Sequence, residues 1–494
     1  MHKTIISALA ERAHRDPDDI VLIGSEQVFT AKTLHAQVLL CAEQLLTAGI
    51  TSLALHADNS PTWIIVDLAC QNTKIRLVPL PLFFSASQQE HAVKSSGVDA
   101  VISQERTFLS SNTVDIACLK LTNLTCQQLV ASNIALPDGT DKITFTSGST
   151  GEAKGVCLSS QQQLSVAEGI VERLQLSDTC HLCLLPLSTL LENIAGVYAP
   201  LLANGCIITP SLMDLGMHGS STLNVDKLLT RLTGYQPNSL ILVPELLLAL
   251  VQACQIGWQP PQSLMFVAVG GGKVSPALLQ NAREHGLPVY EGYGLSECSS
   301  VVCLNSPDQN RTGSVGKALP SRDVYTKEGE VHIPGKAFLG YVNDPASWGK
   351  REVATGDLGY IDDDGFVFIE GRLGNRLISS FGRNISPEWV ESELLAGPLL
   401  AQAVVVGDAK PYCAALVHPR KPDTNQEEID QWINTVNQQL PDYARIQRWQ
   451  CLDQPLTSDR QLLTSNGRPR RQAIQQQLAD AISTLYEGYE EVQC

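Results

Sequence analysis

The chain has 494 residues, with 35 Lys plus Arg against 51 Asp plus Glu, and its formal net charge at pH 7 is −16. This charge argues against a general nucleic-acid binder, because neutralising a phosphate backbone requires a basic surface. The 44% hydrophobic share excludes extensive disorder, and the length allows two or three domains. Because the net charge is negative, any bound polyphosphate must rely on local cations and backbone N–H groups.

The fourteen cysteines are mostly scattered singly, which predicts a reduced cytosolic protein rather than a disulfide scaffold. Cys180 and Cys183 have C-x-x-C spacing but run into an apolar stretch, so two strand neighbours are favoured over a metal or redox site. The first twelve residues become charged too early for a secretory signal, and no window reaches the ~18 apolar residues of a spanning helix. The expected location is cytoplasmic.

The first hundred residues alternate between helical and strand patterns. Apolar side chains at helical spacing predict a helix over 33–49, and Ser60 followed by Pro61 predicts the cap of a helix that continues to 70. Short strands are expected at 53–55, 76–80 and 100–102, with a helix at 88–95 between the last two. Alternation of this kind predicts a parallel or mixed sheet covered by helices.

The same alternation continues to about residue 290. Expected strands lie at 142–146, 182–187, 206–209, 239–243, 264–269 and 287–290, and expected helices at 163–175, 190–203, 225–233, 245–254 and 275–284. From about 311 short strands and Gly/Asp turns take over, which indicates a β-rich subdomain ending near Arg372. The predicted class is α/β (α+β): a large N-terminal domain, 1–372, and a small α+β domain, 373–494, with a final helix near 470–486.

The strongest local signal is the segment from Thr146 to Gly155. An apolar strand enters a loop of glycines and hydroxyls and then reaches Lys154; the loop residues are Ser147, Gly148, Ser149, Thr150 and Gly151. Glycines let backbone N–H groups approach an anion closely, and lysine supplies charge. The spacing differs from G-x-x-x-x-G-K-[ST], so this is not a P-loop. A flexible surface linker is disfavoured, because another apolar stretch follows directly.

A second segment ends the expected strand near 290. It contains Glu291, Gly292, Tyr293, Gly294, Ser296 and Glu297. An aromatic ring beside a tight turn can stack on a planar base, and a carboxylate near a phosphate site can hold Mg²⁺. Taken alone, the segment is better explained as an ordinary turn.

A third segment holds Asp357, after a Thr-Gly pair, and later Arg372, after a glycine. A carboxylate at a strand end can accept hydrogen bonds from ribose hydroxyls. The acidic run 362–364 between them is better explained as a hairpin turn than as a metal cluster.

The order and separation of these three segments resemble the adenylate-forming superfamily, which contains acyl-CoA synthetases, luciferase-like enzymes and peptide-synthetase adenylation domains. The resemblance runs from about Leu9 to Ile474 and includes Gly270, Gly271 and Gly272, the segment 313–317 and the segment 381–391. The stretch 185–193 is similar to one in long-chain fatty acyl-CoA synthetases, with Thr189 and Asn193 in place of its histidine and arginine.

The resemblance implies an ATP- and Mg²⁺-dependent acid–thiol ligase. A small-molecule carboxylic acid, expected to be a medium- or long-chain fatty acid, attacks the α-phosphorus of ATP and gives an acyl-adenylate. The thiol of CoA, or of a carrier protein's phosphopantetheine, then takes the acyl group. By the same resemblance the phosphate loop and Lys154 hold the phosphates and Glu297 holds Mg²⁺. Tyr293 stacks on adenine opposite Gly270–Gly272, Asp357 binds the ribose, and Arg372 adds a cation.

The resemblance further implies that the small domain is mobile and rotates about a hinge near Gly374. Gly382 and Arg383 would then face the pantetheine tunnel. Arg468 occupies the place of the family's catalytic lysine, and the planar guanidinium differs in shape from an ammonium. This departure leaves open a catalytically impaired nucleotide- or acyl-binding module. Independently of it, an acyl-adenylate ligase that loads a carrier protein is a second alternative.

Overall fold

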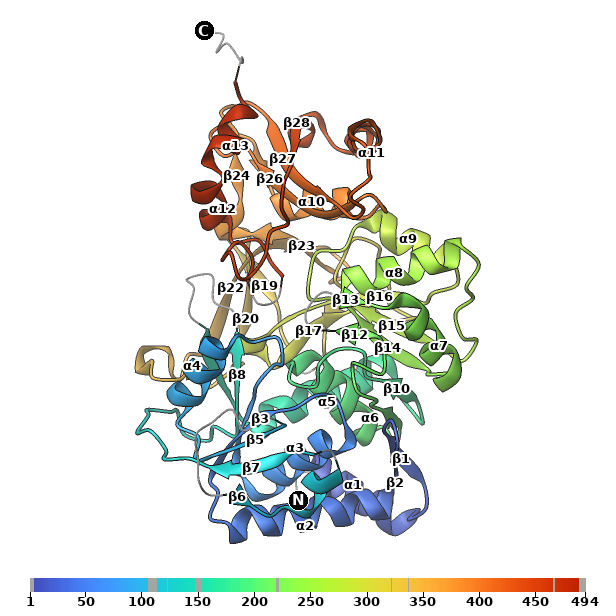
Figure 1. Cartoon of the computed structure of the whole chain (residues 1–494), viewed down its shortest axis with the longest axis vertical. Coiled ribbons are helices and arrows are strands. Elements are labelled where there is room, and N and C mark those ends of the chain that lie inside the picture. Colours follow the sequence, from blue (N-terminus) through green and yellow to red (C-terminus); the bar gives the residue numbers. More distant parts are fainter. Residues whose placement is uncertain are drawn as a thin grey trace.

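The computed structural model describes residues 4–104, 113–121, 123–146, 153–218, 222–320, 322–335, 337–464 and 467–487. Together they form an elongated molecule, with α1 (Ile5–Arg15) towards one end and α13 (Ala479–Thr484) towards the other (Figure 1). Mixed sheets covered by helices make up the larger part, as the sequence predicts. None of the described helices is long and apolar enough to cross a membrane.

One large sheet is built mainly from the first 158 residues. Its described strands lie in the order β21 (Gly340–Tyr341), β9 (Lys154–Leu158), β8 (Lys142–Thr146), β4 (Arg76–Pro79), β3 (Ser52–His56), β5 (Ala100–Ser103), β7 (Thr125–Gln128) and β6 (Thr113–Val114). The central strands pair in parallel and are almost wholly buried, which explains their continuous apolar sequence. The helices of this part are α2 (Ala31–Thr47), α3 (Pro61–Thr73) and α4 (Ala86–Ser96), and each starts at a Ser or Thr cap. The cap predicted at Ser60 is confirmed.

A second large sheet carries the strand that enters the candidate site. Its described order is β18 (Lys317–Ala318), β17 (Ser300–Leu304), β16 (Val289–Leu295), β15 (Phe266–Val269), β14 (Ser239–Leu242), β10 (Cys180–Leu182), β11 (Cys206–Ile208), β1 (Ile20–Ile23) and β2 (Val28–Thr30). Its helices are α5 (Ser160–Leu174), α6 (Ala199–Leu202), α7 (Val225–Tyr235), α8 (Pro244–Gln255) and α9 (Pro276–Glu284). Because β14, β15 and β16 run in parallel, the segments that follow them meet at one edge.

The segment 182–203 differs from the prediction of a strand followed by an ordinary helix. The strand ends at Leu182, although Cys183 N still donates to Ile208 O (2.9 Å). Further along, backbone N–H groups bond to side chains instead: Leu185 donates to Glu192 (3.0 Å) and Leu187 to Asn59 (2.8 Å). The expected helix is a π-helix, η2 (Glu192–Tyr198), followed by α6. Pro186 lies within the expected strand, and Gly196 and Pro200 lie within the expected helix, so this segment also contains residues that disfavour regular strands and helices.

The β-rich subdomain is confirmed as an antiparallel sheet. Its described order is β19 (Tyr325–Lys327), β20 (Glu330–Pro334), β22 (Glu352–Ile361) and β23 (Val367–Arg372). The acidic run 362–364 lies in the turn between β22 and β23, where Asp362 accepts from Phe366 N (2.8 Å). The register of this pair sets Asp357 opposite Arg372.

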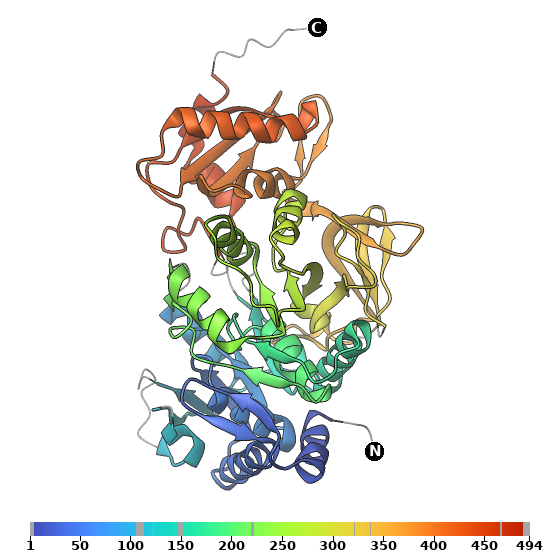
Figure 2. The same cartoon turned by 90° about the vertical axis from the view of Figure 1, so that its right-hand side faces the viewer.

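The last part of the chain covers one end of the larger body (Figures 1 and 2). It contains the sheet β26 (Leu400–Val406), β27 (Cys413–Pro419) and β28 (Ile446–Cys451), the hairpin β24 (Leu377–Ile378) and β25 (Asn384–Ile385), and the helices α10 (Pro387–Leu395) and α11 (Gln426–Gln439). The helix expected over 470–486 is divided at Leu478 into α12 (Arg471–Gln477) and α13, without a Gly, Pro or side-chain cap that would reveal the break.

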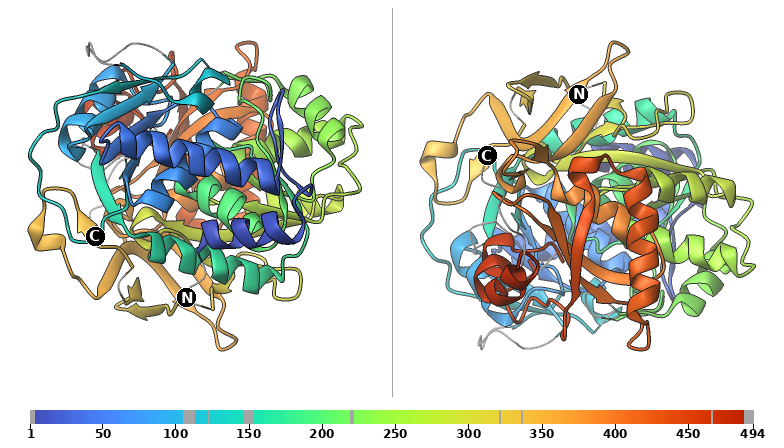
Figure 3. Two further views of the ribbon diagram at one scale, coloured as in Figure 1. Left: turned by 90° about the horizontal axis from the view of Figure 1, so that it is seen from below. Right: turned by 90° about the horizontal axis from the view of Figure 1, so that it is seen from above.

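The apolar cores follow the same division. Three clusters of buried apolar residues use side chains from 5 to 367, whereas two others use only side chains from 377 to 485. Between them lie the end of β23 and the short helix η5 (Leu373–Asn375). Seen from above, β28 and α11 lie over the body rather than beside it (Figure 3).

Candidate active site

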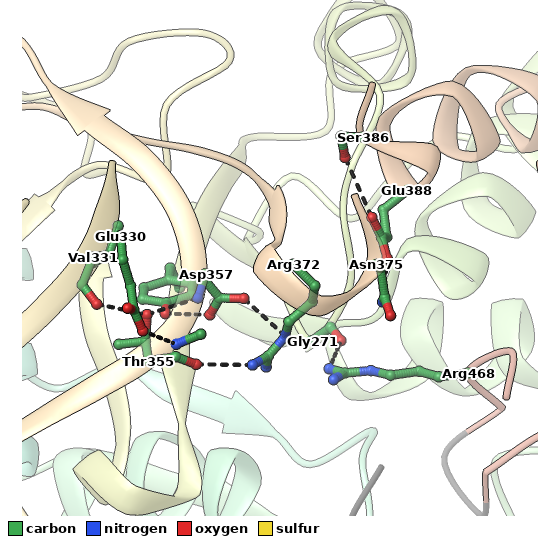
Figure 4. A network of polar contacts seen from close by, with 12 residues as sticks. Gly271, Glu330, Val331, Thr355, Asp357, Arg372, Asn375, Ser386, Glu388 and Arg468 are labelled. Carbon is green, nitrogen blue, oxygen red and sulfur yellow. Dashed lines mark hydrogen bonds and ion pairs between the residues drawn. The ribbon is translucent and has the colours of Figure 1, made fainter. Parts of the chain in front are cut away.

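Three predicted side chains, one each from β16, β22 and β23, meet in one place. The Tyr293 hydroxyl donates to Asp357 Oδ2 (2.6 Å), and Arg372 Nε lies 2.8 Å from Asp357 Oδ1. We call these residues, with Thr355, the Asp357 cluster (Figure 4). The Asp357 side chain is 7% exposed and that of Arg372 is 43% exposed, so the cluster opens to solvent on its arginine side.

The backbone around Asp357 is fixed from behind. Asp357 N donates to Thr355 Oγ1 (3.0 Å), and Thr355 O accepts from Arg372 Nη1 (2.9 Å). Gly356, whose positive φ of 71° suits glycine, donates its N–H to Glu330 Oε1 (2.8 Å). Burial raises the pKa of Asp357, while the Arg372 cation opposes this rise. Burial and the carboxylate raise the pKa of Tyr293, so its hydroxyl remains a neutral donor.

The predicted glycines lie beside this cluster and keep the strand ends narrow. A Cβ on Gly270 would lie 3.1 Å from Gly292 O, and one on Gly294 would lie 1.7 Å from Ser300 O. Side chains at these positions would force neighbouring backbone apart. Gly272 lies in the same loop, near Pro244. The loop 270–272 and the strand segment 292–294 therefore pack closely together, and their glycines add no side chains. We call these two segments the glycine wall.

Arg468 reaches this wall from the C-terminal part of the chain. Its Nη2 donates to Gly271 O (2.7 Å), across 197 residues of sequence (Figure 4). In the same loop Ser275 Oγ donates to Glu393 Oε2 of α10 (2.7 Å). Figure 4 also places Arg372 between Asp357 and Arg468. Two guanidinium groups from different parts of the molecule thus face one region beside the Asp357 cluster.

A second cluster lies around Tyr341 on the edge strand β21. The Tyr341 hydroxyl donates to Glu297 Oε1 (2.9 Å), and Lys154 Nζ lies 5.5 Å from the centroid of the Tyr341 ring. Glu297 and Ser296 belong to the short helix η3 (Ser296–Cys298), directly after β16. We call Lys154, Glu297 and Tyr341 the Tyr341 cluster. Two of its three members are predicted site residues, brought together through a residue that the sequence analysis did not select.

The phosphate-loop prediction is described only at its two ends. Thr146 ends β8 and pairs with Lys154, the first residue of β9. The antiparallel pairing confirms the strand–loop–strand arrangement on either side of the loop. Its central residues lie outside the described part of the chain; these are Ser147, Gly148, Ser149, Thr150 and Gly151.

Glu291 differs from the other predicted carboxylates because it is buried at 4% exposure in the middle of β16. Burial raises the pKa of its carboxyl to about 7, against the opposing charges of Lys273 and Arg283. The side chain therefore titrates near neutral pH, unlike an exposed glutamate.

The predicted hinge and pantetheine residues lie on the C-terminal side of β23. Gly374 is in η5, and the neighbouring Asn375 donates to Glu388 Oε1 (2.6 Å). Gly382 and Arg383 form the turn between β24 and β25, closed by Ser379 N donating to Arg383 O (3.0 Å). Among the described residues, no hydrogen bond or ion pair joins this turn to the Asp357 cluster.

Sequence reasoning missed three residues of the site: Tyr341, Thr355 as a backbone support, and Glu330. Tyr341 and Glu297 are 44 residues apart, and no local spacing rule connects a Gly-Tyr pair in one edge strand to a carboxylate after another strand. Thr355 could be anticipated from its place next to the Gly-Asp pair, because a hydroxyl there can bond the following backbone.

Among the described residues, one group of side chains that could ligate a metal ion comes together: His181, Cys183 and Glu192. Cys183 is one of the two cysteines of the C-x-x-C pair. His181 Nε2 lies 2.8 Å from Glu192 Oε1, and its Nδ1 lies 2.9 Å from Ser239 Oγ. A Cβ on Gly196 would lie 2.5 Å from Glu192 Oε1, so backbone fills the space beside these groups. The arrangement is that of a buried hydrogen-bond network rather than an ion site.

The chemistry of the Tyr341 cluster fits a hard divalent cation beside a phosphate. Glu297 has one oxygen held by Tyr341, and Ser296 adds a hydroxyl next to it. Oxygen ligands of this kind suit Mg²⁺, which usually keeps several waters and binds through one or two carboxylates and phosphate oxygens. Lys154 supplies the nearby positive charge that a polyphosphate requires.

Comparison with family models finds two matches in this chain. The AMP-binding enzyme family matches residues 9–337, and the AMP-binding enzyme C-terminal domain matches residues 374–490. A long-chain-fatty-acid–CoA ligase of Mycobacterium bovis is 32% identical over 251 residues, 44% of this chain and 41% of that protein. The 2-succinylbenzoate–CoA ligase of Bacillus subtilis is 28% identical over 426 residues, 81% of this chain and 84% of that protein.

Solved structures share the fold over nearly the whole chain. The o-succinylbenzoate CoA synthetase of Bacillus subtilis, in complex with its acyl-adenylate intermediate, has a TM-score of 0.76 at 23% identity and covers 94% of this chain and 97% of its own. An anthranilate CoA ligase in complex with anthranoyl-AMP has a TM-score of 0.78 at 16% identity and covers 97% and 98%. At these identities the likeness establishes the fold, which confirms the predicted fold class.

Proposed function

The chain belongs to the AMP-binding enzyme family, and on that premise we propose that it is an ATP-dependent acid–thiol ligase that forms an acyl-adenylate and then a CoA thioester. The observation that carries this proposal is the meeting of four separate sequence segments at one place. Asp357, Tyr293 and the Gly271 loop lie together, and Arg468 reaches them from the far end of the chain.

The Asp357 cluster binds the nucleoside part of ATP. A carboxylate can accept about four hydrogen bonds, and each Asp357 oxygen already accepts one from a protein donor. The remaining acceptor sites suit the two ribose hydroxyls. The glycines of 270–272 and 292–294 place no side chains beside Tyr293, so a flat base can stack against the Tyr293 ring.

Lys154 and Glu297 act on the phosphates. Lys154 and the N–H groups of the loop that precedes it neutralise the β- and γ-phosphates, and Glu297 with Ser296 holds Mg²⁺. When bound, the metal neutralises charge on the phosphate oxygens. Adenylate formation is a displacement at phosphorus, so it depends on positioning and charge neutralisation more than on covalent participation by the protein.

Arg468 takes the lysine's place in the adenylation step. Its guanidinium lies at the Gly271 loop, near Arg372, and can bind the substrate carboxylate and an α-phosphate oxygen as a planar fork. The fork can contact two oxygens at once, whereas an ammonium acts as a point charge. Arginine therefore preserves the charge of the site while changing its geometry.

We further propose a boundary between residues 372 and 373, with a hinge near Gly374. The separate apolar clusters on either side of it support this division. No neighbouring heavy atom lies within 4 Å of a Cβ built on Gly374, so the position has space to change conformation. Rotation about it would bring the turn with Gly382 and Arg383 towards the bound acyl-adenylate, so that a pantetheine thiol could attack.

A fatty acid of medium or long chain is the proposed substrate. The buried cation nearest the 185–202 segment is Lys142, which donates to Asp67 (2.8 Å), Asn193 (2.6 Å) and Tyr198 (2.7 Å). All three ammonium donors are used, so Lys142 is not available to a second carboxylate. A monocarboxylic acid with an apolar tail agrees with this arrangement better than a dicarboxylic acid does.

The test is pyrophosphate release with an acid panel, with and without CoA, using fatty acids of 8 to 16 carbons and 2-succinylbenzoate. We expect release with the fatty acids and thioester formation only when CoA is present. Release without a CoA thioester would favour a carrier protein as acceptor. No release with any acid, from a protein that still binds ATP, would favour the impaired binding module.

Asp357→Asn and Lys154→Ala provide matched variants for the two halves of the ATP site. We expect Asp357→Asn to weaken AMP and ATP equally, because both contain the ribose. Lys154→Ala should weaken ATP much more than AMP, because AMP lacks the β- and γ-phosphates. The reverse pattern would contradict the assignment of the two clusters.

A further inference from the structure

Tyr341 connects the two charged groups of the phosphate half of the site. Its hydroxyl donates to Glu297 Oε1 (2.9 Å), while its ring faces Lys154 Nζ at 5.5 Å. We infer that Tyr341 is a positioning residue that directs the Glu297 carboxylate towards Mg²⁺ and keeps Lys154 available for the phosphates; this inference rests on the proposed function.

The backbone of Tyr341 is held on several sides. Its N–H donates to Ser347 Oγ (2.8 Å), and its carbonyl accepts from Trp348 Nε1 (2.8 Å). The residue also pairs with Val156 of β9, two positions after Lys154. The preceding Gly340 allows this packing, since a Cβ there would lie 2.3 Å from Trp348 Cδ1. The phenol is therefore presented by a fixed edge strand rather than by a free loop.

The ring is fixed as well as the backbone. Phe338 packs against it edge to face, with ring centroids 5.1 Å apart. The Tyr341 hydroxyl carries one hydrogen and donates it to Glu297 Oε1. A fixed donor on Oε1 leaves Oε2 for a metal ion and favours one orientation of the carboxylate.

The ring has a separate effect on Lys154. A cation in contact with an aromatic face is attracted by the ring quadrupole without being neutralised. The attraction is weak at an exposed position, about 0.5–1 kcal/mol, so a polyphosphate can displace it. Tyr341 thus gives both the cation and the carboxylate an uncharged partner in the absence of nucleotide. Within the described part of the chain, neither Lys154 nor Glu297 forms an ion pair that ATP would have to break.

The experiment measures equilibrium binding of α,β-methylene-ATP, a non-hydrolysable analogue, while Mg²⁺ is titrated, with AMP binding as a parallel measurement. We expect Tyr341→Phe to raise the Mg²⁺ concentration needed for half-maximal analogue binding about tenfold, because Glu297 loses a hydrogen bond to a charged group. AMP affinity should change less than about twofold, since the Asp357 cluster is untouched. Tyr341→Leu also removes the ring that holds Lys154. In the absence of metal, it should bind the analogue about threefold more weakly than Tyr341→Phe does.

Tyr325→Phe is the matched control. Tyr325 also donates to a glutamate, Glu352, but on β19 and β22 at the edge of the β-rich subdomain. This variant removes the same kind of hydrogen bond and should leave the Mg²⁺ midpoint unchanged. A change as large as that of Tyr341→Phe would mean that the effect is not specific to the site and would overturn the inference.

A double-variant cycle separates positioning from folding. In a Glu297→Gln background the Mg²⁺ midpoint should no longer respond to Tyr341→Phe, because the group that it orients is gone. Additive effects, an unchanged midpoint in Tyr341→Phe, or an equal loss of AMP and analogue binding would each overturn the positioning role. If wild type binds AMP but its analogue binding does not depend on Mg²⁺, the proposed metal site fails too. If wild type binds neither nucleotide, the proposed function itself fails.

Discussion

Asp67 and Asp357 have similar partners in opposite surroundings. Asp67 Oδ2 accepts from Tyr198 (2.6 Å) and its Oδ1 from Lys142 (2.8 Å), whereas Asp357 accepts from a tyrosine and an arginine in the same way. The Asp67 and Lys142 side chains are 0% and 2% exposed, and those of Asp357 and Arg372 are 7% and 43% exposed. The chemistry is alike, and access to solvent differs.

This difference shows how one set of side chains can serve either the fold or a ligand. In the buried group Asn193 also donates to Asp67 (3.0 Å), so every strong donor and acceptor has a protein partner. In the Asp357 cluster the cation is half in solvent, and the carboxylate keeps acceptor capacity on its open side. The first arrangement is expected to hold structure, and the second can exchange partners with a nucleotide.

Removing the buried carboxylate should give the largest effect on stability. We expect Asp67→Asn to lower the free energy of unfolding by about 3–5 kcal/mol, because it leaves the Lys142 ammonium buried without a counter-charge. Denaturant unfolding measures the change. The double variant Asp67→Leu/Lys142→Met should recover most of it, since a buried ion pair can be replaced by apolar side chains at little cost. A loss below 1 kcal/mol for Asp67→Asn would remove the contrast with Asp357.

Glu291 extends the comparison, because its exposure of 4% lies between those of Asp67 and Asp357, but its carboxylate forms no ion pair among the described residues. Its folded pKa of about 7 exceeds the ordinary glutamate value of 4.5, so the native state holds the proton more tightly. The resulting stabilisation is complete below pH 4.5 and is lost as the pH rises through 7, by about 3 kcal/mol at most.

Measuring unfolding free energies between pH 5 and 8 checks this prediction. The wild type should lose stability relative to Glu291→Gln as the pH rises, because the glutamine cannot ionise. Parallel pH profiles for the two proteins would show that Glu291 titrates normally and that β16 is less enclosed than the structure indicates.

Changing Asp357 should affect binding and spare stability. We expect Asp357→Asn to weaken AMP binding about thirtyfold, or about 2 kcal/mol, because a hydrogen bond to a charged group is lost. The free energy of unfolding should fall by less than about 1 kcal/mol, since Arg372 is half exposed and can be solvated. Calorimetric titration measures the AMP affinity, and denaturant unfolding measures the stability. A large loss of stability with unchanged AMP affinity would mean that Asp357 has a structural role like that of Asp67.

Arg468 should show the smallest effect of the four, and on one step alone. We expect Arg468→Ala to slow carboxylate-dependent pyrophosphate exchange about tenfold or more, and Arg468→Lys to retain exchange, because the charge is preserved. Thermal stability should hardly change, since the side chain is exposed. Unchanged exchange in Arg468→Ala would remove Arg468 from that step.

Much of the fold could be read from local patterns. Continuous apolar runs at β3, β4 and β5 and caps such as Ser60 mark their elements clearly, because burial and capping act over a few residues. The π-helix η2 could not be read, because it depends on Glu192 and Asn193 meeting partners from distant elements. Local periodicity contains no information about such contacts.

The site shows the same limit. Asp357 and Arg372 were recognisable from motifs, and the register of β22 and β23 explains why they meet. Tyr341 was not recognisable, since its importance arises only when an edge strand places it between Lys154 and Glu297. Sequence motifs therefore indicate candidate ligand-binding side chains more readily than the neighbouring side chains that would orient them.

The loop from Gly270 to Ser275 has a thermodynamic consequence. It contributes the glycine wall beside Tyr293, and it also receives Arg468 at Gly271 and Glu393 at Ser275. If a nucleotide orders this loop, docking of the C-terminal part must strengthen nucleotide binding by the same factor by which nucleotide strengthens docking. Weakening either contact should then change the affinity for the nucleotide, even where the altered residue does not touch the nucleotide.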